Sequence, residues 1–108
     1  MPRSLRRTIL FVPANNQRMM EKASKLAADM VILDCEDSVP PKEKLLARQA
    51  ASQALKNYDW GSKEVGIRIN GLDTALWLDD LKSAVRSLPN FILIPKIEDP
   101  AEVKMVDK

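Results

Sequence analysis

Met-Val-Ile-Leu-Asp-Cys-Glu-Asp-Ser, residues 30–38, is the segment from which the architecture of this chain can be inferred. Four apolar residues are followed by three carboxylates with one cysteine among them. The apolar run is too short for a helix, and Pro40 and Pro41 follow closely, so the pattern predicts a buried strand. A strand that is apolar throughout is typical of a parallel sheet covered on both faces. The acids then fall at the carboxyl end of the strand, where α/β proteins bind ligands.

Asp34 and Glu36 would project to the same side if the extended conformation continued, because strand side chains repeat every second residue. Two interpretations fit this spacing. The acids could serve catalysis at the strand end, or they could cap the next helix and face water. Spacing alone does not separate them.

Strand and helix patterns alternate along the whole chain, which implies parallel strands joined by right-handed crossovers. A complete (β/α)8 barrel needs about 250 residues, so residues 1–108 are expected to form a single partial domain. That domain would be the N-terminal half of such a barrel, about four βα units cut off before the second half, or else a small open α/β sheet. The expected strands are 8–12, 30–33, 65–69 and 91–95, and the expected helices are 17–28, 42–56, 74–87 and a last one opening at Asp99-Pro100.

Apolar residues recur at helical spacing in the first three helical segments and predict the faces that pack inward. These residues are Met19, Met20, Ala23, Leu26 and Ala27 in the first, Leu45, Leu46, Ala50, Ala54 and Leu55 in the second, and Ala75, Leu78, Leu81 and Val85 in the third.

Composition excludes several classes of protein. The 108 residues are 45% hydrophobic and 30% charged, with a net charge of +2, which is ordinary for a soluble domain and argues against nucleic acid as a partner. No apolar run is long enough to span a bilayer, and the N-terminus lacks a signal-peptide pattern. The single cysteine, Cys35, fits a reducing compartment, so we expect a cytoplasmic protein, or a mitochondrial-matrix one if the source is eukaryotic. The chain has no histidine, so no Ser-His-Asp or Cys-His site can be built from it.

Polar residues gather where the expected strands end, and Arg68 is the most informative of them. An arginine within an apolar strand is costly to bury unless it is paired or faces a ligand. Its planar fork suits a carboxylate, either that of Glu36 or that of a substrate. An acid-lined pocket that holds an anionic substrate usually needs a divalent cation, and oxygen ligands indicate magnesium. The other polar residues at these ends are Asn15, Asp34, Asp37, Asn70, Lys96 and Glu98.

Arg18 and Lys22 lie four residues apart, so they share one face of the first expected helix. That face is near the helix start, where free N–H groups could help two cations to hold phosphates. A solvated charged face is the alternative.

The motifs together resemble the N-terminal half of the citrate lyase beta-subunit family, which includes malyl-CoA and citramalyl-CoA lyases. The resemblance spans essentially the whole chain in the right order, and the segment from Asp34 to Asp37 with the Asp107-Lys108 ending is most similar to the citramalyl-CoA lyase-like branch. The motifs are residues 7–13, 21–23, 28–29, 31–39, 44 with 47–48, 68–70 and 95–96.

The resemblance implies a (β/α)8 barrel that cleaves a hydroxy-acyl thioester, carried by coenzyme A or an acyl carrier protein, to an oxo acid and an acyl thioester. Arg68 matches the arginine that binds the oxo acid, and Glu36 and Asp37 match acids that line the catalytic pocket. Magnesium is the implied cofactor, with its ligands expected beyond residue 108 and none within this chain. The full-length protein is expected to be a homo-oligomer, and the 108 residues alone to be inactive. Phe11, Arg18 and Lys22 match positions that contact coenzyme A.

The chain departs from the family pattern in two ways, and two rival interpretations exist. The family usually has glycine at Ala14, where close backbone approach matters. The family's two magnesium carboxylates, and the acid that handles the proton on the thioester fragment, come from strands beyond residue 108. Many members also have leucine at Cys35. The related magnesium-dependent aldolases of hydroxy diacids carry histidine at Asp37, and this chain has none. The second rival is a catalytically incomplete half-barrel with a structural role.

Overall fold

The computed structural model describes residues 8–95 and the backbone of residues 103–107. The strands are β1 (Ile9–Pro13), β2 (Met30–Asp34), β3 (Glu64–Arg68), β4 (Phe91–Pro95) and β5 (Val103–Asp107), and the helices are α1 (Gln17–Lys25), the 3-10 turn η2 (Pro41–Glu43), α2 (Lys44–Asn57) and α3 (Trp77–Ser87). No helix in this described part is both long enough and apolar enough to cross a membrane.

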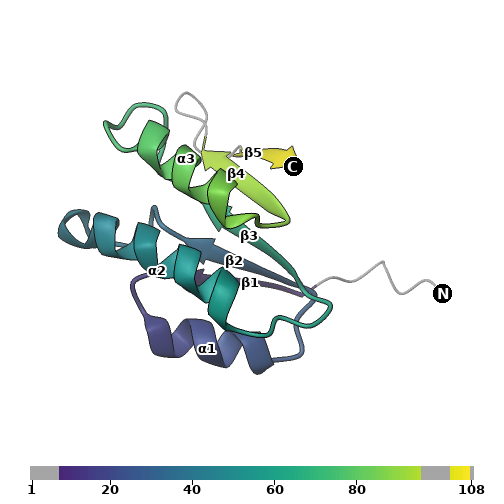
Figure 1. The fold of residues 1–108 in the computed structure, drawn as a ribbon. Coiled ribbons are helices and arrows are strands. Elements are labelled where there is room, and N and C mark those ends of the chain that lie inside the picture. The colour runs from purple at the N-terminus through teal and green to yellow at the C-terminus, as the bar shows by residue number, and fades with distance from the viewer. Residues whose placement is uncertain (1–7, 96–102, 108) are drawn as a thin grey trace.

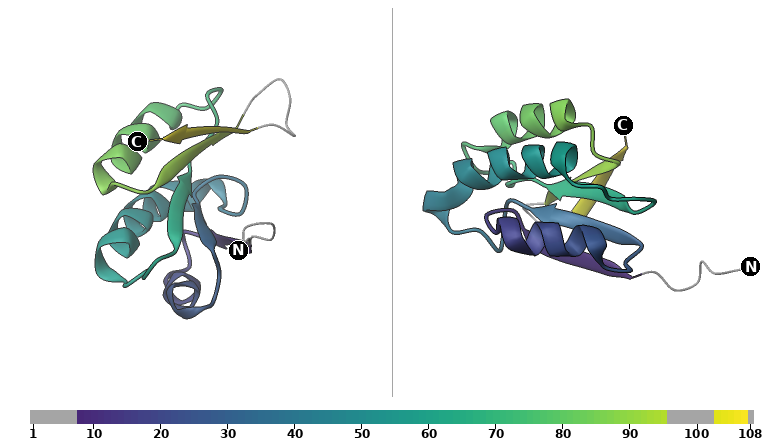
Figure 2. Two further views of the ribbon diagram at one scale, coloured as in Figure 1. Left: turned by 90° about the vertical axis from the view of Figure 1, so that its right-hand side faces the viewer. Right: turned by 60° about the horizontal axis from the view of Figure 1, so that its bottom comes forward.

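The first four strands are parallel and lie in sequence order, β1-β2-β3-β4. Helices α1, α2 and α3 lie on one face of the sheet (Figures 1 and 2). An open doubly wound sheet has helices on both faces and a reversal of strand order. Sequential parallel strands with every helix on one side are instead the arrangement of a (β/α)8 barrel wall. The predicted barrel-type fold is therefore confirmed over β1 to β4.

The last helix predicted from the sequence is wrong where the structure describes it. Residues Val103–Asp107 form β5, which pairs antiparallel with β4. Two of these residues are β-branched valines, which favour extended backbone. Pairing also covers the unpaired N–H and C=O groups that the edge of β4 would otherwise expose. The predicted start of that helix, like Lys96 and Glu98, lies outside the described residues.

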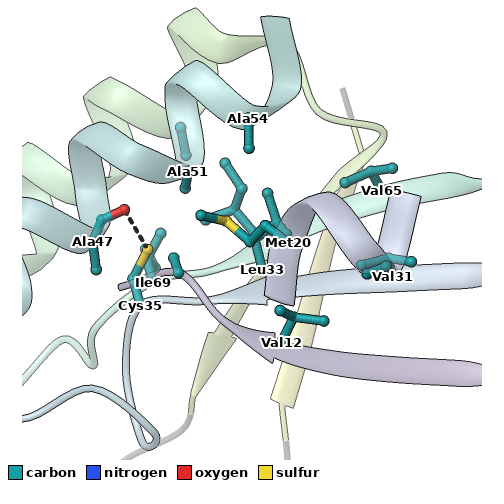
Figure 3. Close-up of a cluster of buried hydrophobic side chains, with 14 of the residues drawn as sticks. Val12, Met20, Val31, Leu33, Cys35, Ala47, Ala51, Ala54, Val65 and Ile69 are labelled. Carbon is teal, nitrogen blue, oxygen red and sulfur yellow. Dashed lines mark hydrogen bonds between the residues drawn. The ribbon is translucent and has the colours of Figure 1, made fainter. Parts of the chain in front are cut away.

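The main core lies between the sheet and the helices. Leu33, Ile92 and Val31 from the strands and Met20 from α1 are fully buried in it (Figure 3). The sheet-facing residues of α2 are small, Ala47, Ala51 and Ala54, so the helix can approach the strands closely.

Several large apolar residues that were predicted to face inward are exposed instead. Leu45 and Leu46 are 59% and 55% exposed, and Leu78 and Val85 of α3 are about half exposed. On α1, Met20 and Ala23 are buried as predicted and Met19 is exposed. Leu26 and Ala27, which were predicted to belong to the same face, lie beyond the end of α1 and are also exposed. Helix α2 carries two apolar stripes, and the alanine stripe is the one that packs on the sheet. The sequence periodicity could not rank the two.

Helix boundaries differ from the prediction for local reasons. Asn16 caps α1 by accepting a hydrogen bond from the Met19 N–H, and α1 ends at Lys25 because Leu26 is extended. Helix α3 begins at Trp77, three residues later than predicted at Thr74. The Thr74 hydroxyl donates to the Gly71 carbonyl and accepts from the Leu76 N–H, which holds a turn before the helix.

The opposite face of the sheet carries aligned layers of side chains. Phe11, Ile32, Gly66 and Phe91 are register partners across four strands. The Phe91 ring covers Gly66 so closely that a β-carbon there would lie 2.2 Å from a ring carbon. Glycine at this position therefore allows the aromatic ring to fill the layer.

We predict that Gly66→Ala lowers the free energy of unfolding by about 1–3 kcal/mol, the usual cost of overpacking. The added methyl group would overlap the Phe91 ring. Urea unfolding measures the change. Combining Gly66→Ala with Phe91→Leu should recover part of the loss, because the smaller side chain makes room. Equal losses in the single and double variants would contradict this account.

Candidate active site

Arg68 and Asp34 form a two-point ion pair at the carboxyl ends of β2 and β3. The Arg68 Nε donates to Asp34 Oδ1 at 2.9 Å, and Nη2 donates to Oδ2 at 2.8 Å. The two residues are register partners on adjacent strands, so the backbone places them side by side. Asp34 is 1% exposed, whereas the Arg68 side chain is 20% exposed. The guanidinium is thus oriented from its buried side and open on the other.

The sequence offered Glu36 or a substrate carboxylate as the partner of Arg68. Glu36 does form an ion pair with it, at 3.5 Å between Oε1 and Nε, but Asp34, which was not proposed as a partner, makes the two closer contacts. Asp34 is the last residue of its strand and lies opposite Arg68, whereas Glu36 follows in a turn. The sequence indicated that both residues lie near strand ends, but the register that places Asp34 opposite Arg68 is visible only in the structure.

Asp34 also organises the turn that follows β2. Its Oδ1 accepts from the Glu36 N–H, and its Oδ2 accepts from the N–H and the hydroxyl of Ser38. Burial alone would raise the pKa of Asp34, but the hydrogen bonds from Arg68, Ser38 and the backbone outweigh it and lower the pKa to about 2. At neutral pH Asp34 is therefore a charged anchor rather than a proton donor.

Glu36 and Asp37 occupy the mouth of the site. Glu36 is half-buried, and burial raises its pKa above the usual value even though Arg68 opposes the shift. Asp37 is exposed. The Nζ of Lys44 donates to the carbonyl of Glu36 at 2.6 Å and to that of Cys35 at 3.4 Å, which fixes the turn that carries both acids.

An open cleft lies beside these acids, between the β2–α2 and β3–α3 connections. Glu36, Asp37 and Lys44 line one wall, and Asn70 and Thr74 line the other. The cleft shares Glu36 with the surroundings of Arg68, so the guanidinium and the cleft belong to one site.

Of the three residues expected to contact coenzyme A, Phe11 lies beside Arg68, and Arg18 and Lys22 do not. Arg68 lies over the Phe11 ring, with 5.0 Å between the guanidinium carbon and the ring centroid, and Phe11 is half exposed. Arg18 and Lys22 are exposed on α1. Among the described residues no recorded contact joins either of them to Arg68.

A buried polar network next to the cleft was not foreseen from the sequence. Asp80, in the first turn of α3, is 3% exposed and pairs with Arg48 of α2 at 2.8 Å. It also accepts hydrogen bonds from the backbone and side chain of Asn70. The sequence signal was weak, because Asp79 and Asp80 stand together at a helix start, where acids are common.

Cys35 is a core residue, as expected. It is 3% exposed, and its thiol donates to the Ala47 carbonyl at 3.8 Å (Figure 3). Burial raises the pKa of the thiol to about 12, so Cys35 is not poised as a nucleophile.

The described residues do not fit a metal site of their own. No group of three or more Asp, Glu, Cys or His side chains in that part of the chain is arranged to hold a metal ion. Asp34 is already engaged by Arg68, Ser38 and the backbone.

The strand order and the one-sided helix layer define part of a (β/α)8 barrel, with polar groups gathered at its strand ends. Residues 7–108 match the family described as HpcH/HpaI aldolase/citrate lyase. The chain belongs to this family.

Similar proteins fall in the same group. The chain is 43% identical to the citrate lyase subunit beta of Leuconostoc mesenteroides subsp. cremoris, over 90% of this chain and 32% of that protein. It is 40% identical to the L-malyl-CoA/beta-methylmalyl-CoA lyase of Rhodobacter capsulatus, over 98% of this chain and 34% of that protein. The chain thus spans about a third of the length of the curated relatives it matches.

Solved structures agree. The protein CitE from Mycobacterium tuberculosis in complex with magnesium and acetate superposes with a TM-score of 0.71 and 33% identity, over 88% of this chain and 38% of that one. The same protein with magnesium, acetoacetate and coenzyme A gives a TM-score of 0.68 and 32% identity, over 88% of this chain and 34% of that one.

We predict a specific acid sensitivity of the Asp34–Arg68 pair. The pKa of Asp34 falls from 3.8 to about 2 on folding, so its contribution to stability is full above pH 4 and is lost as pH falls toward 2. For a pair partly open to solvent the loss is on the order of 1 kcal/mol.

Urea midpoints of wild type and Asp34→Asn between pH 5 and pH 2 measure this contribution. The gap between the two proteins should narrow as pH falls, because protonated Asp34 resembles the amide. Asp37→Asn is the matched control, since Asp37 is exposed. A gap that stays constant down to pH 2 would show that the ionised form of Asp34 is not what stabilises the site.

Proposed function

We propose that the full-length protein containing this chain is a carbon–carbon lyase of the citrate lyase beta-subunit type. It would cleave a hydroxy-acyl thioester, such as a citramalyl, malyl or citryl thioester, to an oxo acid and an acyl thioester. The observation that carries the proposal is the oriented guanidinium of Arg68. Asp34 engages its Nε and Nη2, and the Arg68 side chain is still 20% exposed, so the Nη1–Nη2 edge would be the one offered to a substrate.

Arg68 would bind the carboxylate of the oxo-acid portion. A guanidinium presents two parallel N–H donors along its outer edge, which match the two oxygens of a carboxylate. The Phe11 ring beneath it limits its movement. The preorganised donors would also stabilise negative charge that develops as the carbon–carbon bond breaks.

Glu36 and Asp37 would serve as the acids of the pocket. The raised pKa of Glu36 brings it closer to proton exchange at working pH than an exposed glutamate. Asp37, held at the mouth by the turn that Lys44 fixes, would order polar groups around the substrate.

Coenzyme A would approach from the β1–α1 side. Phe11 lies at the mouth beside Arg68, and α1 begins directly after β1. Arg18 and Lys22 are free of recorded ion pairs in the described part of the chain, which leaves them available to phosphate groups. The support for this assignment is the exposure of both cations on α1, with Arg18 in the first turn and Lys22 in the last.

Magnesium is part of the proposal as a requirement of the whole protein. The solved relatives named above contain magnesium, and it would supply Lewis-acid chemistry when bound. Its ligands would come from parts of the full-length protein outside this chain. By the same argument we expect residues 1–108 alone to be inactive.

We predict that Arg68→Ala weakens pyruvate or oxaloacetate binding roughly 100-fold or more in the full-length protein, because a charge-assisted pair is lost. Arg68→Lys should recover little, since an ammonium cannot reproduce the planar fork. Calorimetry measures the affinities. Arg86→Ala, at an exposed arginine late in α3, is the matched control and should bind normally.

The reaction itself is tested by incubating the full-length protein with hydroxy-acyl thioesters, with magnesium and with a chelator. The oxo acid and the acyl thioester should appear together, and only with the metal. The chain is also 38% identical to a (3S)-malyl-CoA thioesterase of Cereibacter sphaeroides, so the assay should also follow free coenzyme A. Free coenzyme A without oxo acid would replace the lyase proposal with thioester hydrolysis.

A further inference from the structure

Asp80 is the centre of the buried network beside the cleft. Its Oδ1 accepts from Arg48 Nε at 2.8 Å, and its Oδ2 accepts from the backbone N–H of Asn70 at 3.0 Å and from Asn70 Nδ2 at 2.6 Å. Arg48 belongs to α2, Asn70 follows β3 by two residues, and Asp80 belongs to α3. A buried carboxylate is costly unless it is fully hydrogen-bonded, and here each bond also fixes a neighbouring element.

The orientation of the Asn70 amide follows from this geometry. A carboxylate facing a guanidinium only accepts hydrogen bonds, so Asn70 must present its Nδ2 to Asp80. Its Oδ1 is then left as an acceptor, and no hydrogen bond to it is recorded among the described residues. Asn70 lines the cleft with Glu36 and Asp37, two residues beyond Arg68.

The Arg48–Asp80 pair is not arranged for the greatest stability. The Arg48 Nη2 is buried with no partner in the described part of the chain. A buried ion pair often stabilises a protein no more than well-packed apolar side chains of similar volume would. What this pair does achieve is the orientation of Asp80 and, through it, of Asn70.

We propose that Asp80, anchored by Arg48, is a positioning residue that holds the Asn70 amide with Oδ1 toward the cleft, where Oδ1 accepts a hydrogen bond from the substrate hydroxyl. This inference rests on the proposed function. In the hydroxy-acyl part of that substrate the carboxylate and the thioester carbonyl are acceptors, so the hydroxyl is the donor that an amide oxygen can recognise. Arg68 would recognise the acid, and Asn70 the alcohol.

The test compares two ligands that differ in this group. Malate carries the hydroxyl and oxaloacetate does not. Calorimetry on the full-length protein measures both affinities, and steady-state kinetics measure KM and kcat for a hydroxy-acyl thioester. In Asp80→Asn, the new amide has one oxygen for two sets of donors. With that oxygen toward Arg48, its N–H faces Asn70, so the Asn70 side-chain amide reverses and the Asn70 backbone N–H loses its acceptor. We expect malate affinity to fall about tenfold and KM to rise similarly, the usual value of one hydrogen bond, with oxaloacetate affinity and kcat nearly unchanged.

Two further variants make the test decisive. In Arg48→Gln combined with Asp80→Asn, the side-chain oxygen introduced at position 48 can accept from the amide N–H introduced at position 80. The amide oxygen at position 80 is then free to accept from Asn70 as before, so malate affinity should return. If Asp80→Asn does not fold, Asn70→Ala takes its place, because it removes the same acceptor oxygen and should give the same loss of malate affinity alone. Asp79→Asn is the matched control, being an exposed acid in the same helical turn, and should leave both affinities unchanged.

Each outcome bears on the inference separately from the proposed function. Equal losses for malate and oxaloacetate in Asp80→Asn would overturn it in favour of a general structural role. Unchanged malate affinity would overturn it as well, as would a wild-type protein that binds neither ligand. A wild-type protein that prefers malate through Asp80 but cleaves no thioester would disprove the lyase proposal and uphold the positioning of Asn70.

Discussion

The two-point pair between Arg68 and Asp34 is the interaction on which the site depends. It joins the last residues of two neighbouring parallel strands, so its geometry is set by the register of the sheet. Asp34 uses its remaining capacity to hold the turn through Ser38 and the Glu36 N–H. The guanidinium and the acids at the mouth are therefore one rigid unit. A change at Asp34 would disturb both the anion-binding group and the turn that carries the pocket acids.

The two faces of the sheet have separate roles. The face toward the helices holds the main core, in which alanines of α2 pack against strand residues such as Leu33. The other face holds a much smaller apolar cluster among the described residues. Ile32 and Phe91 of this cluster lie one layer below Arg68, and Leu93 lies in the same layer as Arg68. Stability is thus concentrated on the helix side, and chemistry can be placed on the other side without interrupting the core.

The sequence was sufficient for the strands and their parallel direction, because short apolar runs separated by helical patterns have few other solutions. The residue pattern left a half-barrel and an open sheet as alternatives, and the family resemblance favoured the barrel. It was also sufficient to select Arg68, since a charge inside an apolar strand demands a reason. It could not rank Asp34 above Glu36 as the partner, because that choice depends on strand register and on where the turn begins. The sequence also predicted a helix where β5 lies, because the conformation of β5 depends on its pairing with β4 rather than on its local residue pattern. Asp80 was hidden for the same reason, since its partners come from elements distant in the sequence.

The low pKa of Asp34 has a consequence for how the site meets an anion. At any physiological acidity the guanidinium and its anchor cancel each other's charge, so an incoming acid encounters aligned dipoles rather than a bare cation. Such a site distinguishes anions by their shape and by the spacing of their oxygens more than by their net charge. A planar oxo acid should then be preferred over compact inorganic anions, and added salt should compete with it only weakly.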